Sequence, residues 1–327
     1  MTKMKNKNSS SSSHSWVYAI WGANLFVIIC LLVTGMFYLS SQRASAANTS
    51  PETPRPGVTQ KAPPTSYFLP TLTPNPYSTL QVFLTSTPFV LEYGQQSTVI
   101  GVSHEGRPID VYTFGTGDRK YLIVGGIHGG SEWNTIALAN ELIRYINDNP
   151  EVIPSDVTLY IIRNMNPDAE SRSNDEDGRV NNHGVDLNRN FPSSNWIAEW
   201  DRDGCWILRP TTGGDYGGSE PETRAVMSFI ASHKIRAMVS YHSAALGVFP
   251  GGVPWEPASR RLASALGKAT GYPYPPVDTG CEYTGTLADW AVENGASAAV
   301  DMELSTHKST DFKNNLRALE VLLNFVP

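Results

Sequence analysis

Two histidines and two acids stand directly after apolar runs of the sequence, where a polar side chain can emerge from a protein core. They are His128 and Glu132 in "GGIHGGSEW", His242 in "SYHS" and Glu303 in "MEL". A catalytic zinc typically takes three protein ligands of these types and keeps one position open for water, with a base beside it. The four residues therefore have the composition of a zinc-dependent hydrolytic site, if the fold brings them together.

The apolar runs have the length and pattern of buried strands that alternate with helices. We expect strands at 120–127, 157–163, 236–241 and 297–303, and helices at 132–147, 221–233, 256–270, 286–294 and 311–325. Residues 97–115 alternate like a strand or a hairpin. This order predicts one α/β domain with a largely parallel sheet. Because sites in such sheets lie at the carboxyl ends of the strands, we expect the four residues at one edge.

Each of the four residues also has an ordinary structural interpretation. A histidine after a strand is often a hydrogen-bonded core residue, and a glutamate at a helix start interacts favourably with the helix dipole. Their common placement at one sheet edge favours the metal site. His183 in a polar loop and His233 at a helix end are alternative ligands in less suitable positions, while His14 and His104 lie outside the set.

The charge of the chain argues against a nucleic-acid partner. The formal net charge is −6, and residues 1–46 hold four basic side chains and no acids. Without those four positive charges the remainder of the chain carries −10. Proteins that bind nucleic acids present a basic face to the phosphates, so this class is disfavoured.

The N-terminal region has the composition of an export signal. Residues 1–15 are polar with three lysines, and the 24 residues 16–39 carry no charge. A helix of that length spans about 36 Å, enough to cross a ~30 Å hydrocarbon core. We expect a cytoplasmic segment 1–15 and a transmembrane signal anchor at 16–39, with the rest of the chain outside. The small residues "ASAA" (44–47) leave secretion after cleavage near Ala46 as the alternative.

A Pro/Thr/Ser-rich linker is expected at 40–94, before a catalytic domain at 95–327. Nine of the 23 prolines lie at 51–88. Such a composition cannot bury enough apolar surface to fold and is typical of an extended spacer.

Residues 97–327 resemble the zinc metallocarboxypeptidases, especially the compact bacterial type that trims cell-wall peptides. The matching segments occur in the family's order: "IGVSHEGRPI", "GGIHGGSEW", "NPD", "GRVNNHGVDLNRNFP", "GGSEPETRA", "SYHS", "YTGTLADW" and "MEL". The resemblance implies a three-layer α/β/α domain with a mixed, largely parallel sheet, and one zinc ion per chain.

The resemblance also implies a role for individual residues. The zinc ligands are matched by His128, Glu132 and His242, and the general base is matched by Glu303. Arg179 matches the arginine that stabilises the oxyanion, and Asp186 matches the carboxylate that orients His128. The pair that holds the substrate's terminal carboxylate is matched by Asn188 and Arg189. Tyr283 is the best match to the substrate-capping tyrosine, with Tyr272 and Tyr274 as alternatives. Such an arginine pairs with a carboxylate through two parallel hydrogen bonds, which would make the enzyme an exopeptidase.

Three features of the sequence either depart from the family's pattern or leave a property of the protein undecided. The family spaces its first two ligands as His-x-x-Glu, whereas His128 and Glu132 are one residue further apart. We expect the glycine turn to absorb this residue, the alternative being a broken metal site. The resemblance implies that the residue before "DW", here Ala288, lies in the side-chain pocket, where an aspartate would favour basic side chains. A small neutral residue there suggests an open pocket. Cys205 and Cys281 are expected to form a disulfide outside the cytoplasm.

The sequence therefore favours a membrane-anchored, extracytoplasmic zinc carboxypeptidase that acts on peptides with a free C-terminal carboxylate. A cell-wall stem peptide is one candidate substrate and ordinary peptides are the other. An N-acyl amino acid deacylase of the same fold is one alternative, which "SEPET" and "YTGTLADW" disfavour. A catalytically inactive domain that binds wall peptides is the other, which the presence of Glu303 and all three ligands disfavours.

Overall fold

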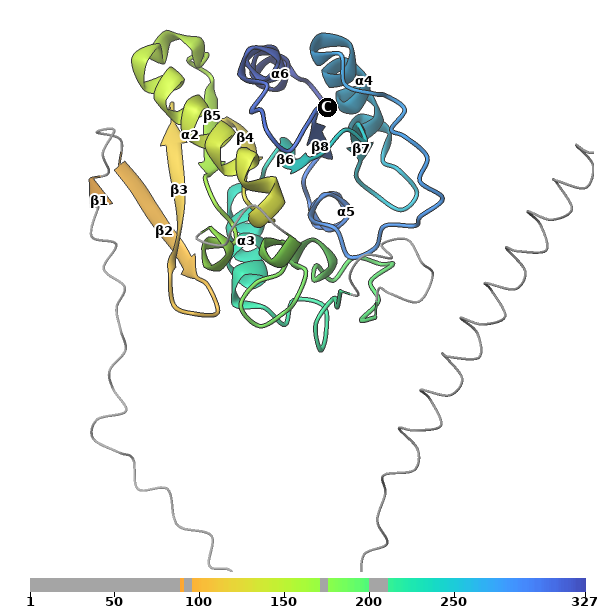
Figure 1. Ribbon diagram of the computed structural model, residues 1–327. Coiled ribbons are helices and arrows are strands. Elements are labelled where there is room, and N and C mark those ends of the chain that lie inside the picture. The colour runs from red at the N-terminus through yellow and green to blue at the C-terminus, as the bar shows by residue number, and fades with distance from the viewer. Residues whose placement is uncertain (1–88, 91–95, 171–175, 200–210) are drawn as a thin grey trace, which may run out of the picture. The chain divides into compact units, whose positions relative to one another are not determined.

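Eight strands form one mixed sheet in the computed structural model, which describes residues 89–90, 96–170, 176–199 and 211–327 (Figure 1). They are β1 (Phe89–Val90), β2 (Gln96–Val102), β3 (Pro108–Phe114), β4 (Arg119–Val124), β5 (Val157–Ile162), β6 (Ala237–Ser243), β7 (Val248–Pro250) and β8 (Ala298–Leu304). The order across the sheet is β1-β2-β3-β5-β4-β6-β8-β7. The central strands β5, β4, β6 and β8 are parallel, and the outer strands pair antiparallel. The prediction of a largely parallel sheet is confirmed.

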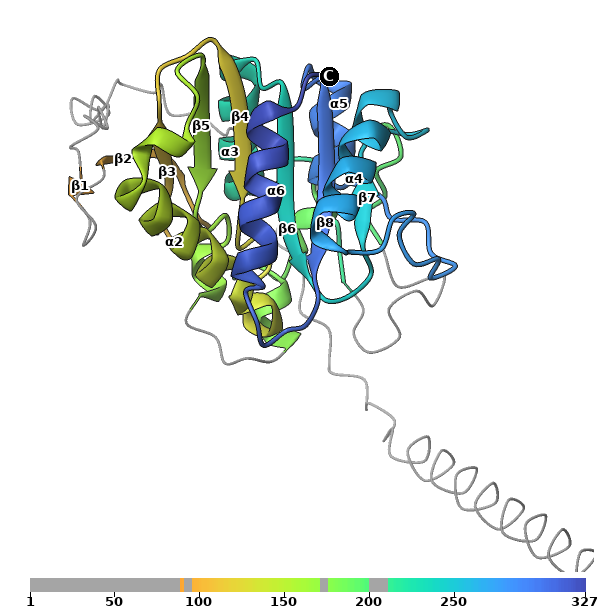
Figure 2. The ribbon, with the colours of Figure 1, turned by 90° about the horizontal axis from the view of Figure 1, so that it is seen from above.

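Helices cover both faces of this sheet (Figure 2). They are α2 (Trp133–Asp148), α3 (Pro221–His233), α4 (Pro257–Thr270), α5 (Leu287–Glu293) and α6 (Phe312–Asn324). Helices α2, α4 and α6 share one hydrophobic core with the sheet, and α3 and α5 share the other. The three-layer arrangement implied by the resemblance is therefore present.

The sequence explains why these segments pack as they do. All six residues of β5 ("VTLYII") and all seven of β6 are buried, because the sheet is covered on both sides. Helix α2 buries Leu138, Leu142 and Ile146 along one stripe. Each such side chain contributes about 1.5–3 kcal/mol when it leaves water.

The order in which the chain adds strands to the sheet reverses at β4, and this reversal determines where the site lies. From β4 the chain passes to β5 on one side, and β6 later pairs with β4 on the other. Open α/β sheets bind ligands at such a switch point, beyond the carboxyl ends of the strands. His128 follows β4, His242 lies at the end of β6, and Glu303 is its partner in the register of β8.

Two details differ from the sequence-based expectations. Strand β4 ends at Val124 rather than at 127, because Gly126 has φ 63° and turns the chain out of the sheet. Two short edge strands were not predicted: β7, and β1, which lies within the segment expected to be linker.

The predicted anchor at 16–39 and almost all of the linker at 40–94 lie outside the described residues. Within the part of the chain that is described, no helix has the length and apolar character needed to cross a membrane.

Candidate active site

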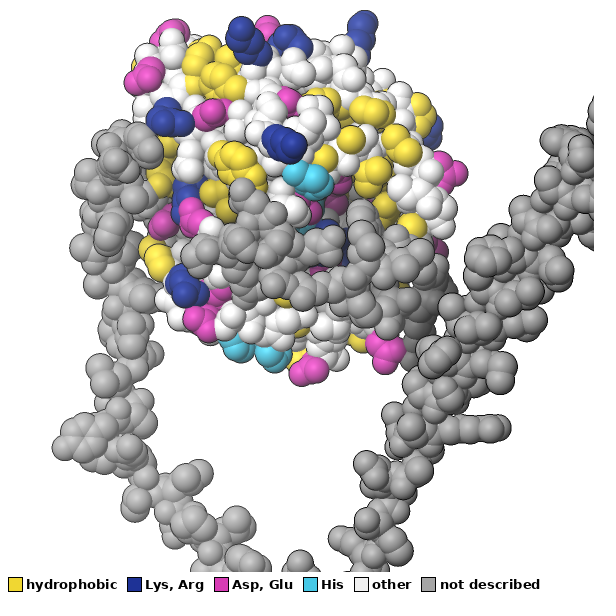
Figure 3. Space-filling view, in the orientation of Figure 1, with side chains coloured by type: hydrophobic (Ala, Val, Ile, Leu, Met, Phe, Trp, Pro, Cys, Tyr) yellow, Lys and Arg dark blue, Asp and Glu magenta, His cyan; other side chains and the backbone are white. Residues whose placement is uncertain are grey.

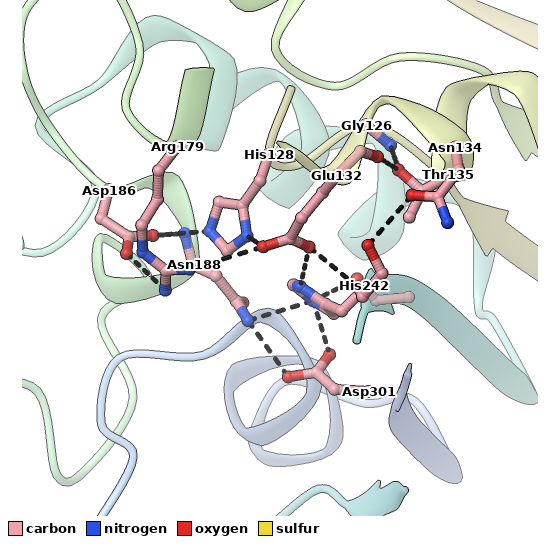
Figure 4. A network of polar contacts seen from close by, with 12 residues as sticks. Gly126, His128, Glu132, Asn134, Thr135, Arg179, Asp186, Asn188, His242 and Asp301 are labelled. Carbon is pink, nitrogen blue, oxygen red and sulfur yellow. Dashed lines mark hydrogen bonds and ion pairs between the residues drawn. The ribbon is translucent and has the colours of Figure 1, made fainter. Parts of the chain in front are cut away.

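Three side chains converge on one buried point (Figure 4). Glu132 Oε1 lies 2.9 Å from His128 Nδ1, and Glu132 Oε2 lies 3.4 Å from His242 Nδ1. The candidate ligand atoms of the three residues all lie within 4.8 Å of one another. The structure thus brings together the three residues that the sequence singled out as metal ligands.

The glycine turn between β4 and α2 accommodates the longer spacing from His128 to Glu132. Gly130 has φ 54° and starts the short 3-10 helix η1 (Gly130–Glu132). Gly178 packs against this turn: Gly129 N donates to Gly178 O at 2.8 Å, and a Cβ at Gly178 would lie 2.0 Å from Gly130 N. The added residue therefore does not move Glu132 out of reach of His128.

A fully buried carboxylate, Asp186, fixes the orientation of His128. Its Oδ1 lies 2.8 Å from His128 Nε2, so the ring presents Nδ1 to Glu132. Its Oδ2 lies 2.9 Å from an Arg179 nitrogen. Burial opposes ionisation of Asp186, but Arg179 and His128 outweigh it and hold the pKa of this carboxyl far below its usual value. Such a carboxylate stabilises the imidazole of a metal ligand.

Arg179 places a positive charge beside the same point. Besides its ion pair with Asp186, its guanidinium lies 3.4 Å from Glu132 Oε1. Burial works against this charge, but Asp186 and Glu132 outweigh it and raise the pKa of Arg179. The short 3-10 helix η4 (Glu176–Arg179) carries this arginine to the cavity.

Burial and neighbouring charges also shift the pKa values of Glu132 and His242. Burial opposes ionisation of Glu132, but His128 and His242 hold its pKa well below the usual range. Burial also works against a protonated His242, but Asp301 and Glu132 outweigh it and raise its pKa to about 10. The carboxylates of Glu132 and Asp301 therefore favour a positive charge at this point.

Glu303 faces this group from β8. It is the register partner of His242, and among the described residues its Oε2 has no hydrogen-bond partner although it is buried. Burial, and then the charge of Glu132, raise the pKa of Glu303 to about 8. A carboxyl group with such a pKa and an unused oxygen suits proton transfer near neutral pH.

Asn188 and Arg189 stand side by side in the short 3-10 helix η5 (Leu187–Arg189), and both line the cavity. The Asn188 side chain is engaged within the protein: Nδ2 donates to Asp301 Oδ2 at 3.2 Å, and Oδ1 accepts from Leu287 N at 2.9 Å. Burial and the nearby Arg179 lower the pKa of Arg189. A buried guanidinium is well suited to a bidentate carboxylate contact.

Of the three tyrosines considered for the capping role, Tyr283 lines the cavity and the other two do not. Its ring lies 5.3 Å from Arg189 Cζ and contacts the ring of Phe249 edge-on at 5.6 Å. Tyr272 is instead buried and donates to Asp311 Oδ2 at 3.0 Å. Tyr274 packs against the core beneath α2, α4 and α6.

One cavity of about 1080 Å³ is lined by the proposed functional side chains other than Asp186: His128, Glu132, Arg179, Asn188, Arg189, His242, Tyr283, Ala288 and Glu303. In the space-filling view, acidic, basic and histidine side chains lie together in a recess near the middle of the face (Figure 3). The apolar part of the wall comes from residues such as Phe249 and Pro250 of β7.

The alternative histidine ligands lie elsewhere. His183 Nδ1 is 3.1 Å from Glu220 Oε2, and its ring stacks on His104 with centroids 4.8 Å apart. These three residues form a second group of possible metal donors, of which both histidines are exposed. His233 stacks on Phe229 at the end of α3 and has a structural role.

Among the cavity residues that the sequence reasoning missed are Asp289, Asp301 and His307. Asp301 could have been found, since it lies two residues before Glu303 in a strand and hence on the same face. Burial raises the pKa of Asp289 to about 6, and the charge of Asp301 adds to the effect. His307 lies in a loop, 3.0 Å from Ser243 Oγ, and no sequence signal identified it.

Cys281, which also lines the cavity, is disulfide-bonded. Its predicted partner, Cys205, lies outside the described residues.

Comparison with known proteins assigns the chain to a family. Residues 91–320 match the zinc carboxypeptidases, peptidase family M14. The chain belongs to this family.

Relatives from animals and bacteria are similar to this chain. Carboxypeptidase A6 of Mus musculus is 29% identical over 244 residues, which cover 63% of this chain and 54% of the relative. Murein peptide amidase A of Escherichia coli K12 is 29% identical over 184 residues, 53% of this chain and 66% of the relative. The chain thus spans between about half and two thirds of the length of these curated relatives.

A solved structure shares the fold. Bovine thrombin-activatable fibrinolysis inhibitor, in complex with tick carboxypeptidase inhibitor, superposes with a TM-score of 0.56 at 21% identity. The match covers 70% of this chain and 89% of that one.

The donor set of this family member fits zinc. Two imidazole nitrogens and a carboxylate are ligands that catalytic zinc takes, and here they are buried and face one another. Both histidines present Nδ1 to Glu132, while their Nε2 atoms contact other residues, Asp186 for His128 and Asn188 for His242. His128, Glu132 and His242 are therefore the residues that would hold the ion.

Proposed function

We propose that the protein is a zinc-dependent carboxypeptidase that removes the C-terminal residue of peptides outside the cytoplasm. The observation that carries the proposal is the meeting of a buried His-Glu-His group, Glu303 and two arginines in one cavity. Family membership supports the same reaction.

The residues of the chain divide the work of hydrolysis. A zinc ion held by the three ligands would act as a Lewis acid on the scissile carbonyl and make a bound water more acidic. Glu303 takes a proton from the attacking water and passes it to the amide nitrogen as the carbon–nitrogen bond breaks. Arg179 stabilises the negative charge that develops on the carbonyl oxygen. The products are a shortened peptide and a free amino acid.

Arg189, with Asn188 beside it, selects the end of the substrate. The guanidinium binds the terminal carboxylate and thereby places the last amide bond next to Glu303. Tyr283, next to Arg189, covers the bound residue, and Ala288 forms part of the wall around its side chain. A substrate without a free carboxylate would lose this ion pair.

The position of the enzyme outside the cytoplasm is supported by two features. Residues 16–39 have the composition of a signal anchor, and Cys281 is disulfide-bonded, as is common outside the cytoplasm. One relative is named a murein peptide amidase and others are carboxypeptidases, so cell-wall stem peptides and ordinary peptides are both candidate substrates.

The test is to incubate the zinc-loaded protein with a peptide library that varies the C-terminal residue, with muropeptides, and with N-acyl amino acids. Mass spectrometry then shows which bond breaks. The proposal predicts loss of one C-terminal residue from peptides or muropeptides. Release of acetate or succinate from acylated amino acids would replace it by a deacylase, and no hydrolysis of any substrate would favour a binding domain.

A further inference from the structure

Two buried aspartates of the cavity have no part in the hydrolysis proposed above. Asp289 of α5 is 7% exposed and Asp301 of β8 is 8% exposed. Both line the cavity together with Ala288 and Phe249. The neutral Ala288 suggested an open pocket without an acid, but the structure supplies acids from neighbouring positions.

Asp301 has one oxygen that the protein leaves without a donor. Its Oδ2 accepts from Asn188 Nδ2 at 3.2 Å, whereas Oδ1 has no hydrogen-bond partner among the described residues. The nearest ring nitrogen, His242 Nε2, is 3.7 Å from Oδ1, which is beyond hydrogen-bond distance. Asp186 contacts His128 at 2.8 Å, so the two carboxylates are not equivalent partners of the two histidines.

A buried carboxylate oxygen without a donor is costly. Natural proteins keep such a group where a ligand supplies the missing donor, or where the group takes part in chemistry. Glu303 already fills the position of the base, and Asp301 lies beside the residues proposed to hold the substrate carboxylate.

The surroundings of Asp301 fit the side chain of a C-terminal residue. Asn188, in contact with Asp301, is next to Arg189, so a carboxylate bound there places the attached side chain close to Asp301. Phe249 is the register partner of Asp301 across β7 and β8, and with Ala288 it offers an apolar wall for an aliphatic stem. An aliphatic stem that ends in a positive charge satisfies both parts of this environment.

The charged side chains that line the whole cavity also favour a ligand with a positive charge. Its lining acids are Glu132, Asp278, Glu282, Asp289, Asp301 and Glu303, and its lining basic side chains are Arg179, Arg189 and Arg260. A zinc ion would balance the charges at its ligands, and the substrate carboxylate would take up that of Arg189. Asp301 is then left with its 3.7 Å contact to His242 as its ion pair among the described residues, and Asp289, which accepts from Gly252 N at 2.8 Å, adds a second buried carboxylate.

We propose that the C-terminal residue removed by this enzyme carries a cationic side chain, which Asp301, assisted by Asp289, receives. Lysine and arginine have this chemistry, and diaminopimelate, a component of wall peptides, offers the same ammonium group next to a second carboxylate. The inference rests on the carboxypeptidase activity proposed above.

The experiment compares two peptides that differ only in the terminal charge: one ends in lysine, the other in norleucine. The full-length zinc-loaded protein is expected to prefer lysine in kcat/KM by at least about tenfold, as a charge-assisted hydrogen bond allows. In Asp301→Asn, which keeps the shape but removes the charge, this ratio is expected to fall by about tenfold. Glu282→Gln removes the same charge at an exposed position of the cavity and should leave the ratio within about twofold.

The outcomes separate this inference from the activity on which it rests. Hydrolysis of neither peptide contradicts the proposed function itself. Hydrolysis with a ratio near one in the wild type, or an equal loss on both peptides in Asp301→Asn at unchanged zinc content, overturns the inference while leaving the activity. If Asp301→Asn does not fold, the wild-type ratio and that of Asp289→Asn decide. A third peptide, ending in diaminopimelate, distinguishes the sources: a higher kcat/KM than for lysine indicates wall peptides, and a lower one indicates ordinary peptides.

Discussion

Glu303 is the single residue on which the proposed chemistry depends most directly. It stands across from His242 in neighbouring strands, one of its oxygens has no partner among the described residues, and it does not belong to the ligand group. Its role as base is therefore separable from metal binding by substitution.

The substitution Glu303→Gln should lower kcat by about 10²–10⁴-fold, the usual contribution of a general base. The zinc content should stay near one per chain, because His128, Glu132 and His242 are unchanged. Steady-state kinetics and metal analysis of the same preparation measure both. A variant that loses its zinc would show Glu303 to be a ligand, and one with full activity would place the base elsewhere.

The raised pKa of Glu303 sets the direction of the pH dependence. The base must be ionised, so activity is full above its pKa and is lost as pH falls through it. Burial and the charge of Glu132 raise this pKa to about 8. A zinc ion favours the ionised carboxylate, so the acidic limb of kcat/KM should have its midpoint below 8. A profile of kcat/KM from acid to alkaline pH checks this, and a rate that increases toward acid would contradict the role of Glu303.

At the scale of elements, the turn between β4 and α2 decides whether the metal site forms. Its geometry depends on Gly178, whose backbone oxygen accepts from Gly129 and which leaves no room for a side chain. The turn and the segment that carries Arg179 therefore pack against each other.

Gly178→Ala should therefore weaken zinc binding by about tenfold or more, since groups that orient metal ligands have effects of that size. Gly184→Ala is the matched control: it lies in the following loop with φ 85° and no atom within 4 Å of an added Cβ. That variant carries backbone strain of about 1–2 kcal/mol but should keep its zinc affinity. Competition with a chelator measures both zinc affinities. Equal affinities of the two variants would contradict the role of Gly178 in the metal site.

The elements show how far the sequence could predict the site. The strands before His128, before His242 and up to Glu303 were found, because parallel strands buried on both faces are continuous apolar runs. Strand β7 was missed, since three residues at a sheet edge carry no periodic signal. The fit of Glu132 was expected from the glycine turn, but the contact of this turn with Gly178, a residue distant in the sequence, could not be predicted.

At the scale of the whole molecule, the acidic domain and the uncharged N-terminal run bear on two different questions. The charge of the domain concerns the partner, and the N-terminal run concerns the location of the protein. The domain carries most of the negative charge, which argues only against a nucleic-acid partner. The location rests on residues 16–39, and these lie outside the described part of the chain.

An uncleaved anchor predicts that the mature protein stays in the membrane fraction after a high-salt wash and retains its N-terminal segment. The physical reason is that 24 uncharged residues remain in the hydrocarbon core regardless of salt. N-terminal sequencing of the mature protein measures this. A start at Ala47 and recovery from the medium would instead establish cleavage and secretion.

The central claim is that a zinc ion held by His128, Glu132 and His242 serves the removal of a C-terminal residue gripped through its carboxylate. It is tested most directly by following one peptide, as the free acid and as the C-terminal amide, by mass spectrometry with zinc-loaded and chelated protein. The account predicts loss of one terminal residue from the free acid, a much slower reaction of the amide, and loss of activity on chelation that zinc restores. Cleavage that ignores the terminal carboxylate, or that persists without metal, would contradict it.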